Sequence, residues 1–167
     1  MMMINNNCVS VLIVSDRSST GERQDKSGPV ILKRLEEFGY LIHEYKIVPD
    51  EKEQIIHALL QWSEEKVPLI FTSGGTGFAP RDITPEATLA IIERETPGIS
   101  EYLRYKSFQI TPHAALSRAV SGIKDQSLII NLPGSPKSVL ECLDFLLPVL
   151  PHAIELILDD PGSENNH

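Results

Sequence analysis

The chain has 167 residues, of which 41% are hydrophobic and 23% are charged, and its formal net charge is −8. This length and composition indicate one globular domain with a hydrophobic core. The acidic balance argues against general nucleic-acid binding, which depends on a basic face that displaces counterions.

Neither secretion nor membrane insertion is expected. Residues 1–7 have no basic flank and no apolar core long enough for a secretory signal. The most apolar tract, residues 143–158, is interrupted by charged residues and prolines, so it cannot span a membrane. Cys8 and Cys142 have no metal-ligand spacing and favour a reducing compartment. We therefore expect a cytoplasmic protein without a membrane partner.

The start of the chain predicts a strand, a helix and a second strand. Residues 9–15 are apolar apart from small serines, as expected for a strand covered on both faces. A polar loop is expected over residues 16–27. The glycine-proline pair at 28–29 then opens a helix that Gly39 ends, and residues 41–48 predict the second strand.

An acidic turn precedes the next helix. Asp50 is the expected N-cap, and Glu53 is the acid three residues later that would complete a capping box. Residues 67–72 then predict a short buried strand. The apolar residues between these features share one side of the helix: Ile55, Ile56, Leu59, Leu60 and Trp62.

The second half of the chain predicts further helices and strands. Thr84 is the expected N-cap of one helix, with Pro85 at its first position, and Ser135 is the expected cap of another. The helices are expected over residues 84–92, 98–106, 136–149 and 152–158, and the strands over residues 119–123 and 127–131.

Alternating strands and helices with short connections predict an α/β fold. We expect a three-layer sandwich, with a mostly parallel central sheet flanked by helices. One domain is expected over residues 8–160, with flexible tails over residues 1–7 and 161–167. Because ligands of such sheets lie beyond the carboxyl ends of the strands, polar segments that follow strands are the candidate site. These segments include Asp16, Asp50, residues 74–82 and residues 131–135.

The segment over residues 72–86 is the strongest chemical signal. Gly74, Gly75 and Gly77 can take backbone conformations closed to other residues, so several N–H groups can converge on one anion. Glycine clusters alone more often make tight turns, but the adjoining Arg81-Asp82 pair favours phosphate and metal handling. Neither a P-loop nor a dinucleotide-binding pattern is present.

Two aspartates are the candidates for catalysis. Asp82 lies two residues before a better cap, Thr84, so capping explains it less well than a role in holding a divalent cation. For Asp50, capping alone and capping combined with catalysis both stay open.

A second turn, over residues 131–137, enters a helix N-terminus where free N–H groups and Lys137 could receive another anionic group. A well-capped helix is the simpler interpretation of this turn alone. Arg118, which follows Ser117, could supply a cation to the pocket or form a surface salt bridge. The five histidines show no metal-ligand spacing.

In order and spacing, these segments resemble the MogA/MoaB family of molybdenum-cofactor biosynthesis. The resemblance covers residues 8–158. The matching segments are residues 25–29, 48–51, 72–77, 80–88, 116–118 and 130–137.

The resemblance implies a molybdopterin adenylyltransferase, similar also to the corresponding domain of gephyrin. Such an enzyme joins the terminal phosphate of molybdopterin to AMP from Mg-ATP and releases pyrophosphate. Asp50 and Asp82 match its catalytic residues and would hold Mg²⁺. The resemblance also implies a homotrimer and a transient contact with the molybdenum-insertion enzyme. A non-catalytic molybdopterin-binding or scaffold protein of the MoaB type is the alternative.

The implied ligand-binding residues belong to the glycine loop (residues 74–77), to the second turn (residues 131–137) and to positions near them. They are Ser73, Gly74, Gly75, Thr76, Gly77, Arg81, Ser117, Arg118, Asn131, Pro133, Gly134, Ser135 and Lys137. We expect Asp50, Gly75, Asp82 and Gly134 around one pocket. That pocket should be less negative than the whole protein because of backbone amides and some of the cations Arg17, Lys26, Arg81, Arg118 and Lys137.

Overall fold

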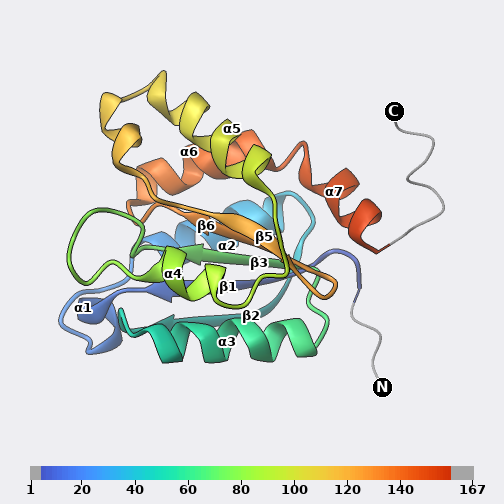
Figure 1. Ribbon diagram of the computed structural model, residues 1–167, viewed down its shortest axis with the longest axis horizontal. Helices are drawn as coiled ribbons and strands as arrows, with labels where there is room; N and C mark the ends of the chain where they lie inside the picture. Colours follow the sequence, from blue (N-terminus) through green and yellow to red (C-terminus); the bar gives the residue numbers. More distant parts are fainter. Residues whose placement is uncertain (1–4, 159–167) are drawn as a thin grey trace.

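The computed structural model describes residues 5–158 and places one six-stranded sheet between helices (Figure 1). The ends of the predicted tails, residues 1–4 and 161–167, and the predicted domain end at residue 160 lie outside the described residues. The strands are β1 (Cys8–Val14), β2 (Leu41–Val48), β3 (Leu69–Ser73), β4 (Arg94–Glu95), β5 (Ser121–Lys124) and β6 (Ser127–Leu132). The helices are α1 (Asp16–Ser19), α2 (Ser27–Glu37), α3 (Lys52–Glu64), α4 (Thr84–Leu89), α5 (Pro97–Phe108), α6 (Pro136–Leu146), α7 (Leu150–Ile157) and the 3₁₀ helix η1 (Pro112–Leu116).

The strand order is β2-β1-β3-β6-β5-β4. Strands β2, β1, β3 and β6 pair in parallel, whereas β5 and β4 add an antiparallel edge. Strand β2 pairs with one edge of β1, and the next strand in the chain, β3, pairs with the opposite edge of β1. The carboxyl ends of β1 and β3 therefore diverge into loops at a topological switch point, where open α/β sheets bind ligands.

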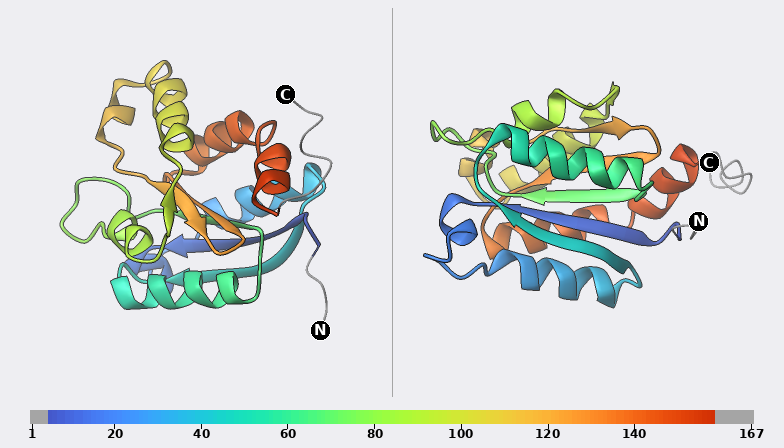
Figure 2. Two further views of the ribbon diagram at one scale, coloured as in Figure 1. Left: turned by 45° about the vertical axis from the view of Figure 1, so that its right-hand side comes forward. Right: turned by 90° about the horizontal axis from the view of Figure 1, so that it is seen from below.

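Alternating side chains of the strands build a hydrophobic core on each face. Val9, Val11 and Ile13 of β1 pack with side chains of α2, α5, α6 and α7, and Leu12 and Val14 pack with α3 and α4. Figures 1 and 2 show the resulting three layers, with α3 and α2 on opposite sides of the sheet. The predicted three-layer α/β class is confirmed.

Some element boundaries differ from the sequence prediction. Residues 16–19 form the short helix α1 inside the expected polar loop, because Ser15 Oγ accepts a hydrogen bond from the Ser18 N–H at 3.2 Å. Helix α4 ends at Leu89 and α6 at Leu146, each about three residues early, and β5 begins two residues later than expected. Strand β4 and helix η1 were not predicted, since a strand of two residues and a 3₁₀ helix of five are too short to create a periodic pattern. No helix within residues 5–158 is both long enough and apolar enough to cross a bilayer.

Candidate active site

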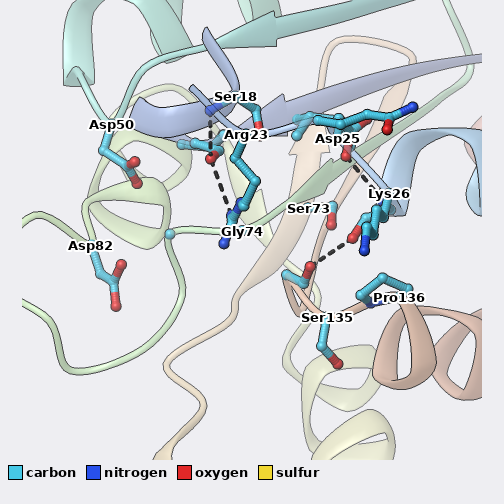
Figure 3. Close-up of a pocket in the computed structure, with 17 residues that line it drawn as sticks. Ser18, Arg23, Asp25, Lys26, Asp50, Ser73, Gly74, Asp82, Ser135 and Pro136 are labelled. Carbon is cyan, nitrogen blue, oxygen red and sulfur yellow. Dashed lines mark hydrogen bonds between the residues drawn. The ribbon is translucent and has the colours of Figure 1, made fainter. Parts of the chain in front are cut away.

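A cavity of about 610 Å³ lies beyond the carboxyl ends of β1, β2, β3 and β6. It contains Asp50, Gly75, Asp82 and Gly134 together, as the strand positions predict. In Figure 3, Asp50 and Asp82 lie at one end, and Lys26, Ser135 and Pro136 lie at the other. The remaining lining residues are Ile13, Val14, Ser15, Ser18, Arg23, Gln24, Asp25, Ser27, Ser73 and Gly74.

Asp50 does not cap helix α3. The helix begins at Lys52, and the cap position is taken by Glu51, whose side chain makes no capping bond, so the predicted capping box is wrong. Asp50 Oδ2 instead accepts the Asp16 N–H at 2.9 Å, across the gap between the β1 and β2 loops. Capping is therefore excluded as the explanation of this carboxylate.

The electrostatic surroundings of Asp50 oppose its ionisation. Burial is the main cause that raises the pKa of Asp50, and the carboxylates of Asp16 and Asp82 raise it further. The hydrogen bond from the Asp16 backbone and the Arg81 charge act in the opposite direction. Hydrogen bonds from Arg81 are the main cause that lowers the pKa of Asp16. Asp50 therefore sits where a bound cation would relieve repulsion between carboxylates.

Two glycines shape the loop that carries Asp82. Gly74 has φ +101° and Gly75 has φ +65°, conformations that L side chains rarely adopt. A Cβ on Gly74 would also collide with the Val14 carbonyl oxygen. Thr84 Oγ1 donates to the Gly74 carbonyl at 2.9 Å, so this hydroxyl braces the loop. Its predicted role as the N-cap of α4 is wrong, because Thr84 is the first helical residue.

Each of the two aspartates has one carboxylate oxygen available. Asp82 Oδ2 accepts the Ala79 N–H at 3.0 Å and Asp50 Oδ2 accepts the Asp16 N–H at 2.9 Å. Neither Oδ1 atom has a hydrogen-bond partner within residues 5–158. The same part of the chain contains no group of three or more His, Cys, Asp or Glu side chains that could hold a metal without a ligand. Mg²⁺ commonly binds through one or two carboxylates, waters and substrate phosphates. The donor set therefore fits Mg²⁺ brought with a phosphate ligand.

Three residues that line the same cavity have unpaired backbone donors. Within the described part of the chain, the N–H groups of Gly75, Gly134 and Ser135 have no protein acceptor. Ser73 Oγ donates to the Pro133 carbonyl at 2.8 Å and so joins the end of β3 to the turn before α6. Ser27 Oγ donates to the Gly134 carbonyl at 2.7 Å and joins the start of α2 to the same turn. Unpaired N–H groups on adjacent turns suit an anion.

Two helix N-termini reach the end of the cavity opposite the aspartates. Helix α2 begins at Ser27, and α6 begins at Pro136 with Ser135 as its N-cap, as predicted, since Ser135 Oγ accepts the Ser138 N–H at 3.2 Å. Asp25 accepts the Ser27 N–H at 3.0 Å and also the Tyr45 hydroxyl. Because the Asp25 carboxylate already caps α2, the N-terminus of α6 is the helix end that favours a phosphate here.

The charged side chains of the cavity are mixed. Arg23 and Lys26 face Asp25, Asp50 and Asp82, so the lining is not uniformly acidic. Lys26 is the cation that the sequence analysis included, and Arg23, which reaches the middle of the cavity in Figure 3, was missed. The other four expected cations, Arg17, Arg81, Arg118 and Lys137, do not line the cavity.

Arg118 holds the glycine loop from outside the cavity. Its Nε donates to the Gly77 carbonyl at 2.7 Å and its Nη2 to the Asp82 carbonyl at 2.9 Å, while Nη1 pairs with Glu86. The guanidinium is therefore occupied by protein acceptors, in place of the predicted ligand contact. Lys137 is 82% exposed and lies 3.9 Å from Glu141.

Five of the predicted ligand-binding residues line a second cavity of about 250 Å³ behind the glycine loop: Thr76, Gly77, Ser117, Asn131 and Pro133. Asn131 is only 1% exposed. Its Nδ2 donates to Thr72 Oγ1 and Thr88 Oγ1, each at 2.9 Å, and its Oδ1 accepts the Val120 N–H at 3.2 Å. These bonds account for Asn131 without a ligand.

We expect Asn131→Ala to destabilise the fold. Truncation removes three hydrogen bonds and leaves the buried Thr72 hydroxyl and the Val120 N–H without a partner, which costs about 2–4 kcal/mol in the free energy of unfolding. Urea denaturation measures this change. Ser138→Ala serves as the nearby control, because it removes one hydroxyl whose hydrogen bond to Ser135 is exposed to solvent. Unchanged stability in Asn131→Ala with weakened ligand binding would instead assign this side chain to the ligand.

The first loop supplied the residues that sequence reasoning missed. Ser18, Arg23 and Gln24 of this loop line the cavity, as does Ser15 directly before it. Charge and hydroxyls in a loop usually indicate solvation alone. The signal that could have identified these residues was their position in the chain, because the loop follows β1, which lies at the switch point of the sheet.

Comparisons with known proteins agree with this geometry. The family model described as a probable molybdopterin binding domain matches residues 10–152. A molybdopterin adenylyltransferase of Helicobacter pylori is 44% identical over 153 residues, which cover 90% of this chain and 87% of that protein. Gephyrin of Dictyostelium discoideum is 47% identical over 165 residues, but the chain spans only 23% of gephyrin's length. The crystal structure of the molybdopterin biosynthesis enzyme MoaB from Thermus thermophilus superposes with a TM-score of 0.87 at 46% identity, covering 92% of this chain and 98% of that one.

Proposed function

The chain belongs to the probable molybdopterin binding domain family, and on that premise we propose that it is a molybdopterin adenylyltransferase of molybdenum-cofactor biosynthesis. In this reaction the terminal phosphate of molybdopterin attacks the α-phosphorus of ATP. A new phosphate–phosphate bond forms, the bond to the β-phosphate breaks, and pyrophosphate leaves.

The observation that carries the proposal is the division of the cavity into two ends. Asp50 and Asp82 each offer a free carboxylate oxygen at one end, and the turn into α6, with the unpaired N–H groups of Gly134 and Ser135, lies toward the other. Two phosphorylated substrates that must approach each other need this combination of cation-holding and anion-holding groups.

The residues have separate roles in this proposal. Asp50 and Asp82 would hold Mg²⁺, which when bound would neutralise charge on the approaching phosphates. The N–H groups of Gly75, Gly134 and Ser135 orient phosphate oxygens and fix the line of attack. No general base is required, because a phosphate monoester is already ionised at neutral pH.

The alternative of a non-catalytic molybdopterin-binding or scaffold protein predicts binding without transfer. The retention of both aspartates with free oxygens favours the enzyme. We include in the proposal ATP as co-substrate, a homotrimer and transient contact with the molybdenum-insertion enzyme, all supported by the family resemblance. A cytoplasmic location is supported by the two free cysteines, Cys8 and Cys142.

Incubation with molybdopterin, ATP and Mg²⁺ tests the proposal. We expect mass spectrometry to detect adenylylated molybdopterin together with stoichiometric pyrophosphate, and neither without ATP. The Helicobacter pylori adenylyltransferase serves as the positive control under the same conditions. If that control forms product while this chain binds molybdopterin and forms none, the chain is a binding protein.

A further inference from the structure

Asp16 and Asp50 form a reciprocal pair. The Asp16 N–H donates to Asp50 Oδ2 at 2.9 Å, and the Asp50 N–H donates to Asp16 Oδ1 at 3.0 Å. The two residues follow different strands, β1 and β2. The pair therefore fixes the separation of two loops and the rotation of the Asp50 carboxylate, leaving Asp50 Oδ1 available to the cavity.

Arg81 connects the loop that carries Asp82 to this pair. Its Nε donates to Asp16 Oδ2 at 3.0 Å and its Nη2 to Asp16 Oδ1 at 2.9 Å, a two-point fork that fits a carboxylate. The same Nη2 lies 2.8 Å from Glu51 Oε1, beside Asp50. Because Arg81 directly precedes Asp82, these bonds join the loops that carry the two candidate catalytic aspartates.

We propose that Asp16 is a positioning residue for Asp50 and that Arg81 acts by holding Asp16. This inference rests on the proposed function for its effect on rate, but the pairing itself does not. Arg81 is 56% exposed and Asp16 41% exposed, so their ion pair contributes little to global stability. Its effect is instead on the geometry of the site, since groups that hydrogen-bond to a cation-holding carboxylate set its orientation.

The test uses Asp16→Ala, Arg81→Ala and the control Arg34→Ala. Arg34 also bridges two acids, Glu37 and Asp144, but on α2 and α6 and outside the cavity lining. We expect Asp16→Ala and Arg81→Ala each to lower kcat for adenylyl transfer about 10–100-fold. KM for molybdopterin and the urea midpoint should change little, and Arg34→Ala should match the wild type in kcat.

Two double variants separate positioning from an independent effect. When one residue acts through another, the effects of substituting each of them on kcat do not add. Adding Asp16→Ala to Asp50→Asn, or Arg81→Ala to Asp16→Ala, should lower kcat less than about twofold further. Multiplied effects in either double variant, or wild-type kcat in Asp16→Ala, would overturn the proposal.

A readout independent of catalysis completes the experiment. The amide resonance of Asp50 reports its hydrogen bond to Asp16 in a nuclear magnetic resonance spectrum. We expect this resonance to move in Asp16→Ala and in Arg81→Ala and to stay in place in Arg34→Ala. If the wild type makes no product, the proposed function fails. The pairing is then still judged by the amide resonance, and an Asp50 resonance unmoved in Arg81→Ala rejects the role of Arg81.

Discussion

Asp50→Asn and Asp82→Asn should each lower adenylyl transfer by about a hundredfold or more, the scale seen when one electrostatic contact to a transition state is lost. Asparagine keeps one oxygen for the backbone N–H that each aspartate accepts, from Asp16 and Ala79 respectively. It removes the negative charge that would hold Mg²⁺. Steady-state kinetics with saturating molybdopterin and ATP measure the loss.

The loss should be confined to catalysis. The urea midpoint and molybdopterin affinity of both variants should stay near those of the wild type. Asp144→Asn is the matched control, because Asp144 lies on α6, pairs with Arg34 and does not line the cavity. Rates near the wild type in both cavity variants, with binding unchanged, would show that these aspartates are structural and that the metal is held elsewhere.

The sequence predicts the layers of this fold because the strands are covered on both faces. The run over β1 is apolar at successive positions, and the structure places Val11 and Leu12 in different cores. The position of the site follows from the same reasoning, since Asp50 and Asp82 both follow parallel strands. Strand order and loop length bring them into one cavity.

The roles of individual polar groups could not be predicted in the same way. A cap is a local pattern, and Asp50 and Thr84 both fit it, but each side chain bonds to a residue distant in sequence. The guanidinium groups of Arg81 and Arg118 also find protein acceptors that only the folded chain brings near. Long-range hydrogen bonds decide these cases, and no spacing in the sequence encodes them.

Gly74→Ala should be the most disruptive single-methyl change in the cavity wall. The backbone at φ +101° strains any L side chain, and the new Cβ would meet the Val14 carbonyl oxygen at the end of β1. That oxygen belongs to the backbone of β1, a strand paired on both sides, so it cannot turn away as a side chain could. Together, strain and overpacking should lower the free energy of unfolding by about 3 kcal/mol.

A series of glycines in the same chain separates the two causes. Gly39 has φ +85° with no atom within 4 Å of an added Cβ, and Gly98 has neither a positive φ nor such a neighbour. Urea denaturation should therefore find Gly98→Ala near the wild type, Gly39→Ala lower by about 1–2 kcal/mol from strain alone, and Gly74→Ala lower still. Equal losses in Gly39→Ala and Gly74→Ala would show that the loop relaxes around the methyl group. In that case, the close approach of Gly74 to Val14 would not be what requires glycine there.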